Sequence, residues 1–310
     1  MFLYLPAFFR RIKDAGFLFL ALAYLSGCGE AVLFKETRVL MDTFVEISCY
    51  SSDKEKALGA IKDSFREIER IERLLSRFDE GSEVSRINRL AGQEEVVVSE
   101  EVFGLIERSI YYSDISGGSF DITAEPQKRS RHRDIRLDRD RLSVRFADSD
   151  IKIDLGGIAK GYAADMAKEV LRSCGIENAL VNIGGNMFAL GSPHGKDSWQ
   201  IGIQHPRDKN AIVHRLSLKD KAISTSGDYE RPLHIIDPAT GNPSTDIAGV
   251  TIVALSAEQA DALSTAVFVM GAEDGYELVR SIEGAEVYIF DKSAYLVPYH
   301  SLRSGTRQAK

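Results

Sequence analysis

The chain has 310 residues, of which 39 are Lys or Arg and 46 are Asp or Glu, and its formal net charge is −7. An acidic balance of this size argues against nucleic acid as a partner. The length, with 44% hydrophobic residues, allows one large domain or two closely packed ones. Because no repeat, low-complexity tract or linker rich in Pro, Gly and Ser divides the sequence, we expect one compact body.

The first 28 residues have the pattern of an export signal. Three cationic residues precede a short apolar run over residues 15–25, and small residues lead to Cys28 as in a bacterial lipobox. The run is too short to span comfortably the roughly 30 Å of hydrocarbon in a bilayer. We therefore predict a signal peptide over residues 1–27 and lipidation of Cys28, with an uncleaved anchor as the alternative. In both cases the body, residues 28–310, is exported.

Two further cysteines lie in the body of the chain. Cys49 sits in an alternating strand pattern and Cys174 near the end of a predicted helix, and neither has C-x-x-C spacing. Two separate, buried thiols are therefore expected, rather than a disulfide or a metal-binding pair.

The N-terminal half alternates between strand and helix patterns. Residues 43–49 alternate as a strand does, and an apolar stripe predicts a helix over residues 52–75 that opens with a capping box, Ser and Glu three residues apart. Shorter helices are predicted to start after Ser82 and after Ser99. Residues 117–123 predict a glycine turn that leads into a strand.

A basic stretch follows that turn. Residues 127–141 carry seven Lys or Arg residues with three Asp residues interleaved. The mixed charges favour a solvated loop and hairpin. A basic patch that faces a polyphosphate or an anionic membrane is the alternative.

Residues 154–165 bring three glycines and a lysine to the place where an extended pattern becomes helical. Residues 151–154 predict a strand, and the apolar spacing after Gly161 predicts a helix that ends before Gly175. Glycines let a ligand approach the backbone, and a first helical turn favours an anion, to which Lys160 would add a charge suited to phosphate. A tight turn with a solvated lysine explains the same residues, because the pattern matches neither common phosphate-binding glycine motif.

The C-terminal half is rich in strand patterns. A short apolar segment and a turn rich in Pro, Gly and Asn occupy residues 233–243. The predicted strands cover residues 179–183, 187–190, 199–204, 212–218, 222–226 and 250–255.

A last helix is predicted from Ser256, which opens a second capping box, to Met270. Asp261 and Thr265 are four residues apart, so their oxygens lie on one face near the positive end of this helix. They suit a hard cation such as Mg²⁺, which takes few protein oxygens and leaves room for substrate phosphates. The alternative is an ordinary first-turn Asp and a Thr bonded back to its own helix.

Eight short motifs, taken in order, resemble those of one family, the ApbE-like FAD:protein FMN transferases. The resemblance covers nearly all of the body of the chain, and the order of the motifs is far more specific than any one of them. The motifs lie at residues 41–43, 82–88, 118–123, 154–165, 182–186, 223–227, 234–238 and 260–265.

This resemblance implies a mixed α/β fold, with a largely antiparallel sheet and flanking helices. It also implies a Mg²⁺-dependent enzyme that transfers the FMN part of FAD to a Thr or Ser hydroxyl of an exported acceptor and releases AMP. The acceptor would be a flavin-bearing subunit of a membrane redox complex, and the enzyme would be lipid-anchored, at the periplasmic face of the inner membrane.

The same resemblance assigns the site residues. The metal would be held by the carbonyl of Gly157 and the side chains of Asp261 and Thr265. His234 is the candidate general base, because a neutral imidazole accepts a proton near pH 7, although a histidine that bridges a turn or grips the nucleotide is an equal alternative. The flavin contacts would be Met41, Ser119, Phe120, Asp121, Asp154 and Lys160.

Two departures from the family pattern stand out. Asp42 replaces the usual glycine after Met41, which predicts a less permissive backbone there, and the segment between Thr123 and Asp154 is shorter than usual. Two alternatives to the transferase are an FAD pyrophosphatase, in which water replaces the acceptor and free FMN is the product, and a non-catalytic exported FAD-binding lipoprotein.

Overall fold

The computed structural model describes residues 30–123, 131–228, 235–244 and 246–297. The predicted signal peptide, Cys28 and His234 lie outside these residues. Within them, every helix is too short or too polar to cross a bilayer.

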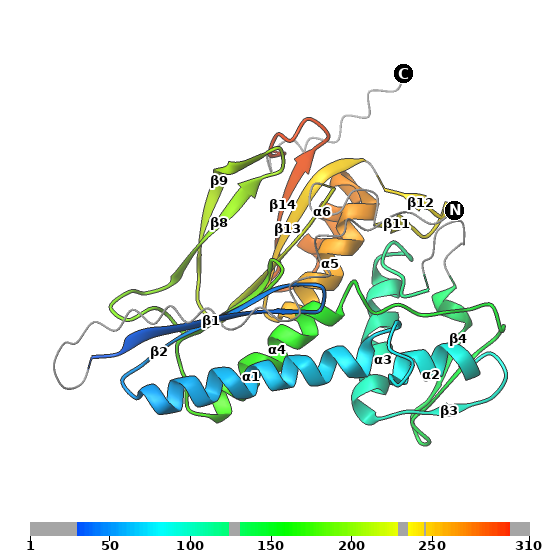
Figure 1. Ribbon diagram of the computed structural model, residues 1–310. Helices are drawn as coiled ribbons and strands as arrows, with labels where there is room; N and C mark the ends of the chain where they lie inside the picture. Colours follow the sequence, from blue (N-terminus) through cyan, green and yellow to red (C-terminus); the bar gives the residue numbers. More distant parts are fainter. Residues whose placement is uncertain (1–29, 124–130, 229–234, 245, 298–310) are drawn as a thin grey trace, which may run out of the picture.

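A seven-stranded sheet forms the centre of the fold (Figure 1). All of its neighbouring strands pair antiparallel, which confirms the predicted sheet type. In spatial order the strands are β1 (Val32–Leu40), β2 (Thr43–Ser51), β6 (Ala179–Ile183), β7 (Asn186–Leu190), β10 (Lys221–Gly227), β13 (Ile247–Ala254) and β14 (Glu286–Asp291).

Helices cover one face of this sheet and a hairpin covers part of the other. Helices α1 (Lys54–Leu75), α4 (Ala159–Ser173) and α5 (Ala257–Met270) share the main hydrophobic core with β2, β6 and β13. On the opposite face, β8 (Trp199–His205) and β9 (Asp208–Leu218) form a long hairpin whose apolar side chains pack against β10, β13 and β14 in a second core. Figure 1 shows this hairpin and the helices on opposite sides of the sheet.

The predicted helices of the N-terminal half are confirmed. The apolar stripe of α1 is buried from Ile61 to Leu75, but its N-cap is Asp53, which accepts the Lys56 N–H, rather than the expected Ser52. Helices α2 (Glu83–Leu90) and α3 (Glu100–Ile115) begin after Ser82 and Ser99, as predicted, and each serine is the N-cap of its helix. The predicted hairpin in the basic stretch is also present, as β4 (Ile135–Asp138) and β5 (Ser143–Phe146), with β3 (Val96–Val97) beside β5.

Two predicted strands are wrong. Residues 120–123 and 151–154 belong to no strand, because side chains and neighbouring turns take up their backbone groups. The amide of Asn88 bonds both the N–H and the carbonyl of Ile153, and the Asp154 N–H donates to the Ile122 carbonyl. The two segments therefore lie against each other without forming a ladder. Strands β1 and β14 and helix α6 (Ala272–Arg280) were not predicted at all.

The turn between β1 and β2 explains how the chain accommodates Asp42. Leu40 pairs with Thr43, so Met41 and Asp42 form a two-residue hairpin turn, and their φ angles are 51° and 57°. Both positions of such a turn need positive φ, which Asp tolerates better than most residues other than glycine. Asp42 therefore adopts the backbone conformation for which a glycine is usually chosen.

The remaining short elements agree with the sequence. Strands β11 (Ile236–Asp237) and β12 (Asn242–Pro243) enclose the predicted Pro- and Gly-rich turn. Cys49 is buried, Cys174 is partly buried, and both are free thiols. The expectation of two separate thiols is confirmed, but the expectation that both are buried is wrong for Cys174.

Candidate active site

Helices α4 and α5 meet at their N-terminal ends with almost no space between their backbones. Gly161, in the first turn of α4, lies so close to α5 that a Cβ added to it would be 2.1 Å from the Ala257 carbonyl oxygen and 2.7 Å from the Asp261 Cβ. Only glycine fits there. We call this contact, formed by Gly157, Gly161, Asp165, Ala257 and Asp261, the α4–α5 junction.

Each helix of the junction donates backbone N–H groups to an aspartate of the other helix. The Gly161 N–H donates to Asp261 Oδ2 over 2.9 Å, across 100 positions of the chain. In return, Asp165 of α4 accepts the N–H groups of Ala257 and Glu258 over 3.0 and 2.9 Å, at the start of α5. A carboxylate near a helix N-terminus is favoured by the helix dipole and by the unpaired N–H groups there. The anion attracted by the start of α4 is thus the protein's own Asp261.

Burial opposes ionisation of both aspartates. Asp261 is only 4% exposed, and its burial raises its pKa, against the charge of Lys160 and the N–H groups of Gly161 and Lys160, which lower it. Burial likewise raises the pKa of Asp165, against the two N–H groups of α5 and the charge of Lys168. A cation beside Asp261 would favour its ionised form.

The predicted metal ligands are brought together at this junction. A Cβ built on Gly157 would lie 3.4 Å from Thr265 Oγ1 and 3.1 Å from Phe120 Cε2, so the glycine turn faces both side chains. Thr265 lies one helical turn beyond Asp261 on α5. Gly157 thus lies beside Thr265, which is about a hundred positions later in the sequence and one helical turn from Asp261.

The chemistry of these donors fits Mg²⁺. They are a carboxylate, a hydroxyl and a backbone carbonyl, all hard oxygens, and Mg²⁺ binds through one or two carboxylates and takes its other ligands from water and phosphates. An ionised carboxylate accepts about four bonds, so the backbone N–H groups leave Asp261 room for a cation. Among the described residues no group of three or more His, Cys, Asp or Glu is placed to hold a metal.

Asp154 and Lys160 flank the glycine turn. Asp154 Oδ1 accepts the Gly156 N–H over 2.8 Å, and its Oδ2 lies 3.0 Å from Nε of Arg77. The Lys160 ammonium donates to the Gly156 carbonyl over 3.1 Å. Two cations therefore stand near the turn that leads to the junction. Sequence reasoning missed Arg77, because it lies in the loop between α1 and α2 and no spacing pattern connects it to Asp154.

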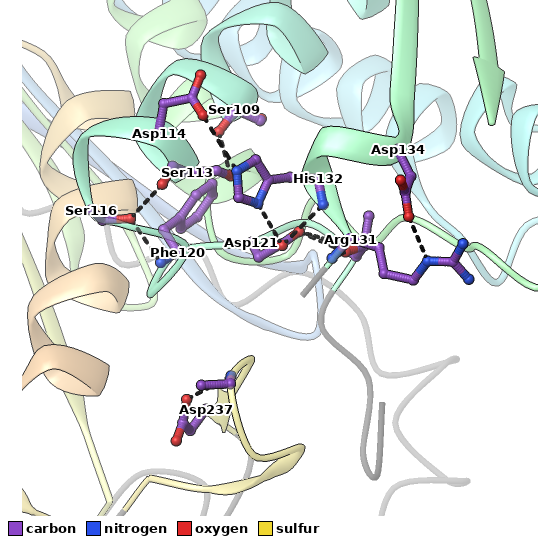
Figure 2. A network of polar contacts seen from close by, with 12 residues as sticks. Ser109, Ser113, Asp114, Ser116, Phe120, Asp121, Arg131, His132, Asp134 and Asp237 are labelled. Carbon is purple, nitrogen blue, oxygen red and sulfur yellow. Dashed lines mark hydrogen bonds and ion pairs between the residues drawn. The ribbon is translucent and has the colours of Figure 1, made fainter. Parts of the chain in front are cut away.

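The other predicted flavin contacts lie on two further segments. Met41 is half-buried at the tip of the β1–β2 hairpin, and its backbone N–H donates to the Glu72 carboxylate. The Ser119 N–H donates to the Ser116 carbonyl, and Phe120 is buried against the glycine turn. The Asp121 carboxylate accepts a hydrogen bond from the Thr123 N–H and contacts the His132 ring (the latter in Figure 2), so its oxygens face the protein rather than an open surface.

Comparison with known proteins agrees with the fold. A relative from Treponema pallidum (strain Nichols), named FAD:protein FMN transferase, is 31% identical over 89% of this chain and 90% of its own length. A relative of the same name from Klebsiella pneumoniae is 28% identical over 86% of this chain and 91% of its own. Both names denote transferases.

Solved structures resemble this one over most of their length. The ApbE protein of Thermotoga maritima superimposes with a TM-score of 0.80 at 31% identity, and covers 88% of this chain and 98% of its own. The flavin transferase ApbE of Vibrio cholerae superimposes with a TM-score of 0.76 at 25% identity, and covers 84% of this chain and 94% of its own.

These likenesses identify both the class and the family of the chain. The fold and the curated relatives define it as an enzyme of the transferase class. The model of the ApbE family matches residues 41–289, and the chain belongs to that family.

Proposed function

We propose that this chain is an exported, Mg²⁺-dependent FAD:protein FMN transferase. One observation carries the proposal: the structure joins the glycine turn before α4 to Asp261 and Thr265 of α5, through close approach of the backbone and a buried carboxylate. The relatives named FAD:protein FMN transferase, each aligned over most of its length, support the choice of flavin and acceptor.

The reaction would exchange the phosphoanhydride bond of FAD for a phosphoester bond to the acceptor. The acceptor hydroxyl oxygen attacks the FMN-side phosphorus of FAD, the bridging P–O bond breaks, AMP leaves with the bridging oxygen, and a base takes the hydroxyl proton. Such transfers depend mainly on positioning and on stabilisation of charge. His234 is the proposed base, and it lies outside the described residues.

The residues of the junction would supply the charge and the alignment. The Gly157 carbonyl, Asp261 and Thr265 would hold Mg²⁺, which when bound neutralises phosphate charge. Lys160, beside the glycine turn, would attract the pyrophosphate, and the Asp154–Arg77 pair would fix the turn from its other side. Phe120 would keep the turn in place by packing against Gly157.

The test measures AMP release by the full-length protein in detergent with FAD and Mg²⁺. Asp261→Asn keeps the shape of the side chain but removes its charge, and we expect a loss of AMP release of about a hundredfold or more. The matched control is Asp63→Asn, on the exposed face of α1, whose carboxylate is 50% exposed and paired with Arg66; it should behave as wild type. Wild-type rates in Asp261→Asn would overturn the metal assignment.

Mass spectrometry of an added acceptor separates the transferase from the pyrophosphatase. A phosphoester-linked FMN on a Thr or Ser of a flavin-bearing subunit of a membrane redox complex supports transfer, whereas free FMN alone supports hydrolysis. Bound FAD without AMP would instead support a flavin-binding lipoprotein.

We also propose that residues 1–27 are cleaved and that Cys28 carries the lipid that anchors residues 28–310 at the periplasmic face of the inner membrane. The N-terminal peptide of the membrane-extracted protein should then begin at a diacylated Cys28, and an intact Met1 would contradict this.

A further inference from the structure

Four consecutive residues beside the glycine turn, Phe120 to Thr123, are held by three other parts of the chain. The Phe120 N–H donates to Ser116 Oγ at the end of α3, over 3.0 Å. The Ile122 carbonyl accepts the Asp154 N–H over 2.7 Å. Asp121 and Thr123 are held by residues that follow in the chain, after residue 130. This segment has no ladder partner, so polar contacts, rather than a sheet, determine its position.

Asp121 is the centre of those contacts. Its Oδ1 accepts both the N–H and the hydroxyl of Thr123, each over 2.7 Å. Its Oδ2 accepts the N–H of His132 over 3.2 Å and lies 2.9 Å from Nδ1 of the same residue. The Thr123 hydroxyl also accepts the Arg131 N–H over 2.9 Å. We call these four residues, Asp121, Thr123, Arg131 and His132, the Asp121 cluster; Figure 2 shows the contact between Asp121 and His132.

His132 connects this cluster to helix α3. Its side chain is only 6% exposed, and Nε2 lies 3.4 Å from Oδ1 of Asp114, in the last turn of α3. An ionised carboxylate can only accept, so Nδ1 carries the proton that is shared with Asp121. A hydrogen bond to an ionised acceptor is stronger than a neutral one. His132 therefore fixes Asp121 between the end of α3 and the start of β4.

Asp121 is covalently next to Phe120, and Phe120 touches the proposed metal site. The Phe120 ring lies 3.1 Å from the place of a Gly157 Cβ, and it also makes an edge contact with Tyr112 of α3, with centroids 6.3 Å apart. A displacement of Asp121 would move Phe120, and Phe120 sets the position of the turn that carries the Gly157 carbonyl. The path from His132 to that carbonyl therefore runs through two side chains only.

We propose that His132 is a positioning residue for the FAD site: it fixes Asp121, and through Phe120 it fixes the glycine turn against α5. This inference rests on the proposed function for the identity of the ligand. It gives Asp121 a positioning role, because both of its carboxylate oxygens accept donors from Thr123 or His132 and its side chain is fully buried.

The experiment measures the Kd for FAD by quenching of flavin fluorescence, with Mg²⁺ present, and the KM and kcat for AMP release. His132→Leu removes the donor, and we expect both Kd and KM to rise about tenfold, the usual result of losing a hydrogen bond to a charged group. His132→Asn keeps an N–H donor near the place of Nδ1 and should recover most of this loss. Thr123→Val is a milder second variant that removes one donor to Asp121, and a rise in Kd of about threefold is expected.

Arg133→Ala is the matched control. It shortens an exposed side chain next to His132 and leaves the four residues of the Asp121 cluster unchanged, so its Kd should equal that of wild type. A purely structural role would lower the melting temperature of His132→Leu and Thr123→Val and leave the Kd of the folded protein unchanged; this result would overturn the proposal. If wild type binds FAD but releases no AMP, the proposed function fails, while the Kd series still decides the role of His132.

Discussion

The α4–α5 junction and the Asp121 cluster lie on two sides of the same glycine turn, but they are held together in different ways. At the junction, backbone meets backbone: Gly161 leaves no room for a Cβ, and two buried aspartates accept N–H groups across the contact. In the Asp121 cluster, one carboxylate gathers side-chain and backbone donors from a short stretch of chain. The stability of the junction depends on close packing of two backbones, whereas that of the Asp121 cluster depends on hydrogen-bond donors to one carboxylate.

This difference predicts which substitutions each region tolerates. A packed backbone contact fails when any atom is added, because interiors have few voids into which a new methyl group can move. A cluster around a carboxylate fails when a donor is lost, and it recovers when another donor stands in the same place. Small changes of volume should therefore be severe at the junction, and isosteric polar changes should be mild in the cluster.

The largest effect is expected from Gly161→Ala. The new Cβ would lie 2.1 Å from the Ala257 carbonyl oxygen, which is backbone and cannot turn away. The helices must separate, at a cost of about 3 kcal/mol in the free energy of unfolding, and Asp261 must leave the Gly161 N–H. Urea unfolding should show this loss, and AMP release should fall with it.

Gly59→Ala is the control for that substitution. Gly59 lies within α1, and a Cβ there would meet nothing within 4 Å. Because alanine favours helix over glycine, this variant should gain about 0.5–1 kcal/mol. If Gly161→Ala proved as stable and as active as Gly59→Ala, the close contact between the two backbones would be refuted.

A smaller effect is expected from Asp165→Ala. Its comparison with Ser256→Ala distinguishes a cap supplied by the other helix from a cap supplied by the same helix. It leaves the N–H groups of Ala257 and Glu258 without their acceptor, and the cost should be about 2 kcal/mol. Ser256→Ala removes the cap inside α5, the bond to the Gln259 N–H, at about 1 kcal/mol.

Only Asp165→Ala removes a tie between α4 and α5, so only it should also raise the Mg²⁺ concentration needed for half-maximal AMP release. A magnesium titration of both variants checks this. Equal requirements in the two would mean that Asp165 acts as an ordinary cap.

The sequence predicted the junction better than it predicted the segment beside it. Local patterns gave α5, its cap Ser256 and the shared face of Asp261 and Thr265, because capping and helical periodicity depend on neighbouring residues. The resemblance to the ApbE family then linked Gly157 to Asp261, which no spacing rule could do. The reciprocal bonds of Asp165 and Asp261 join residues about a hundred positions apart, so only the folded chain reveals them.

Residues 120–123 and 151–154 were predicted wrongly for a related reason. Their alternation of apolar and polar residues is typical of strands, and the apolar side chains are indeed buried, among them Ile122, Ile151 and Ile153. The alternation therefore predicted correctly which side chains are buried, but not how the backbone is hydrogen-bonded. Asn88 and the Asp121 cluster supply the partners that a neighbouring strand would have supplied. Periodicity reports which side chains are buried, and the partner of the backbone must be found in the fold.

The smallest effect is expected in the alkylation rate of Cys49, which tests whether a change in either region loosens the main core. Cys49 lies on β2 within the main core, and burial raises the pKa of its thiol from an ordinary value of 9 to about 11. Because the thiolate is the reactive form, alkylation of Cys49 at pH 8 should be slow, and it should quicken about tenfold per pH unit up to pH 11. Stability changes with pH in the opposite direction to reactivity. The thiol ionises at lower pH in the unfolded chain than in the folded one, so its contribution to the free energy of unfolding is intact below pH 9 and is lost as the pH approaches 11.

Peptide mass spectrometry can follow the alkylation of Cys49 beside that of the partly buried Cys174. Gly161→Ala, which displaces α4 from that core, should speed alkylation of Cys49, whereas His132→Leu should leave it at the wild-type rate; equal acceleration in both variants would show that the two regions are not independent.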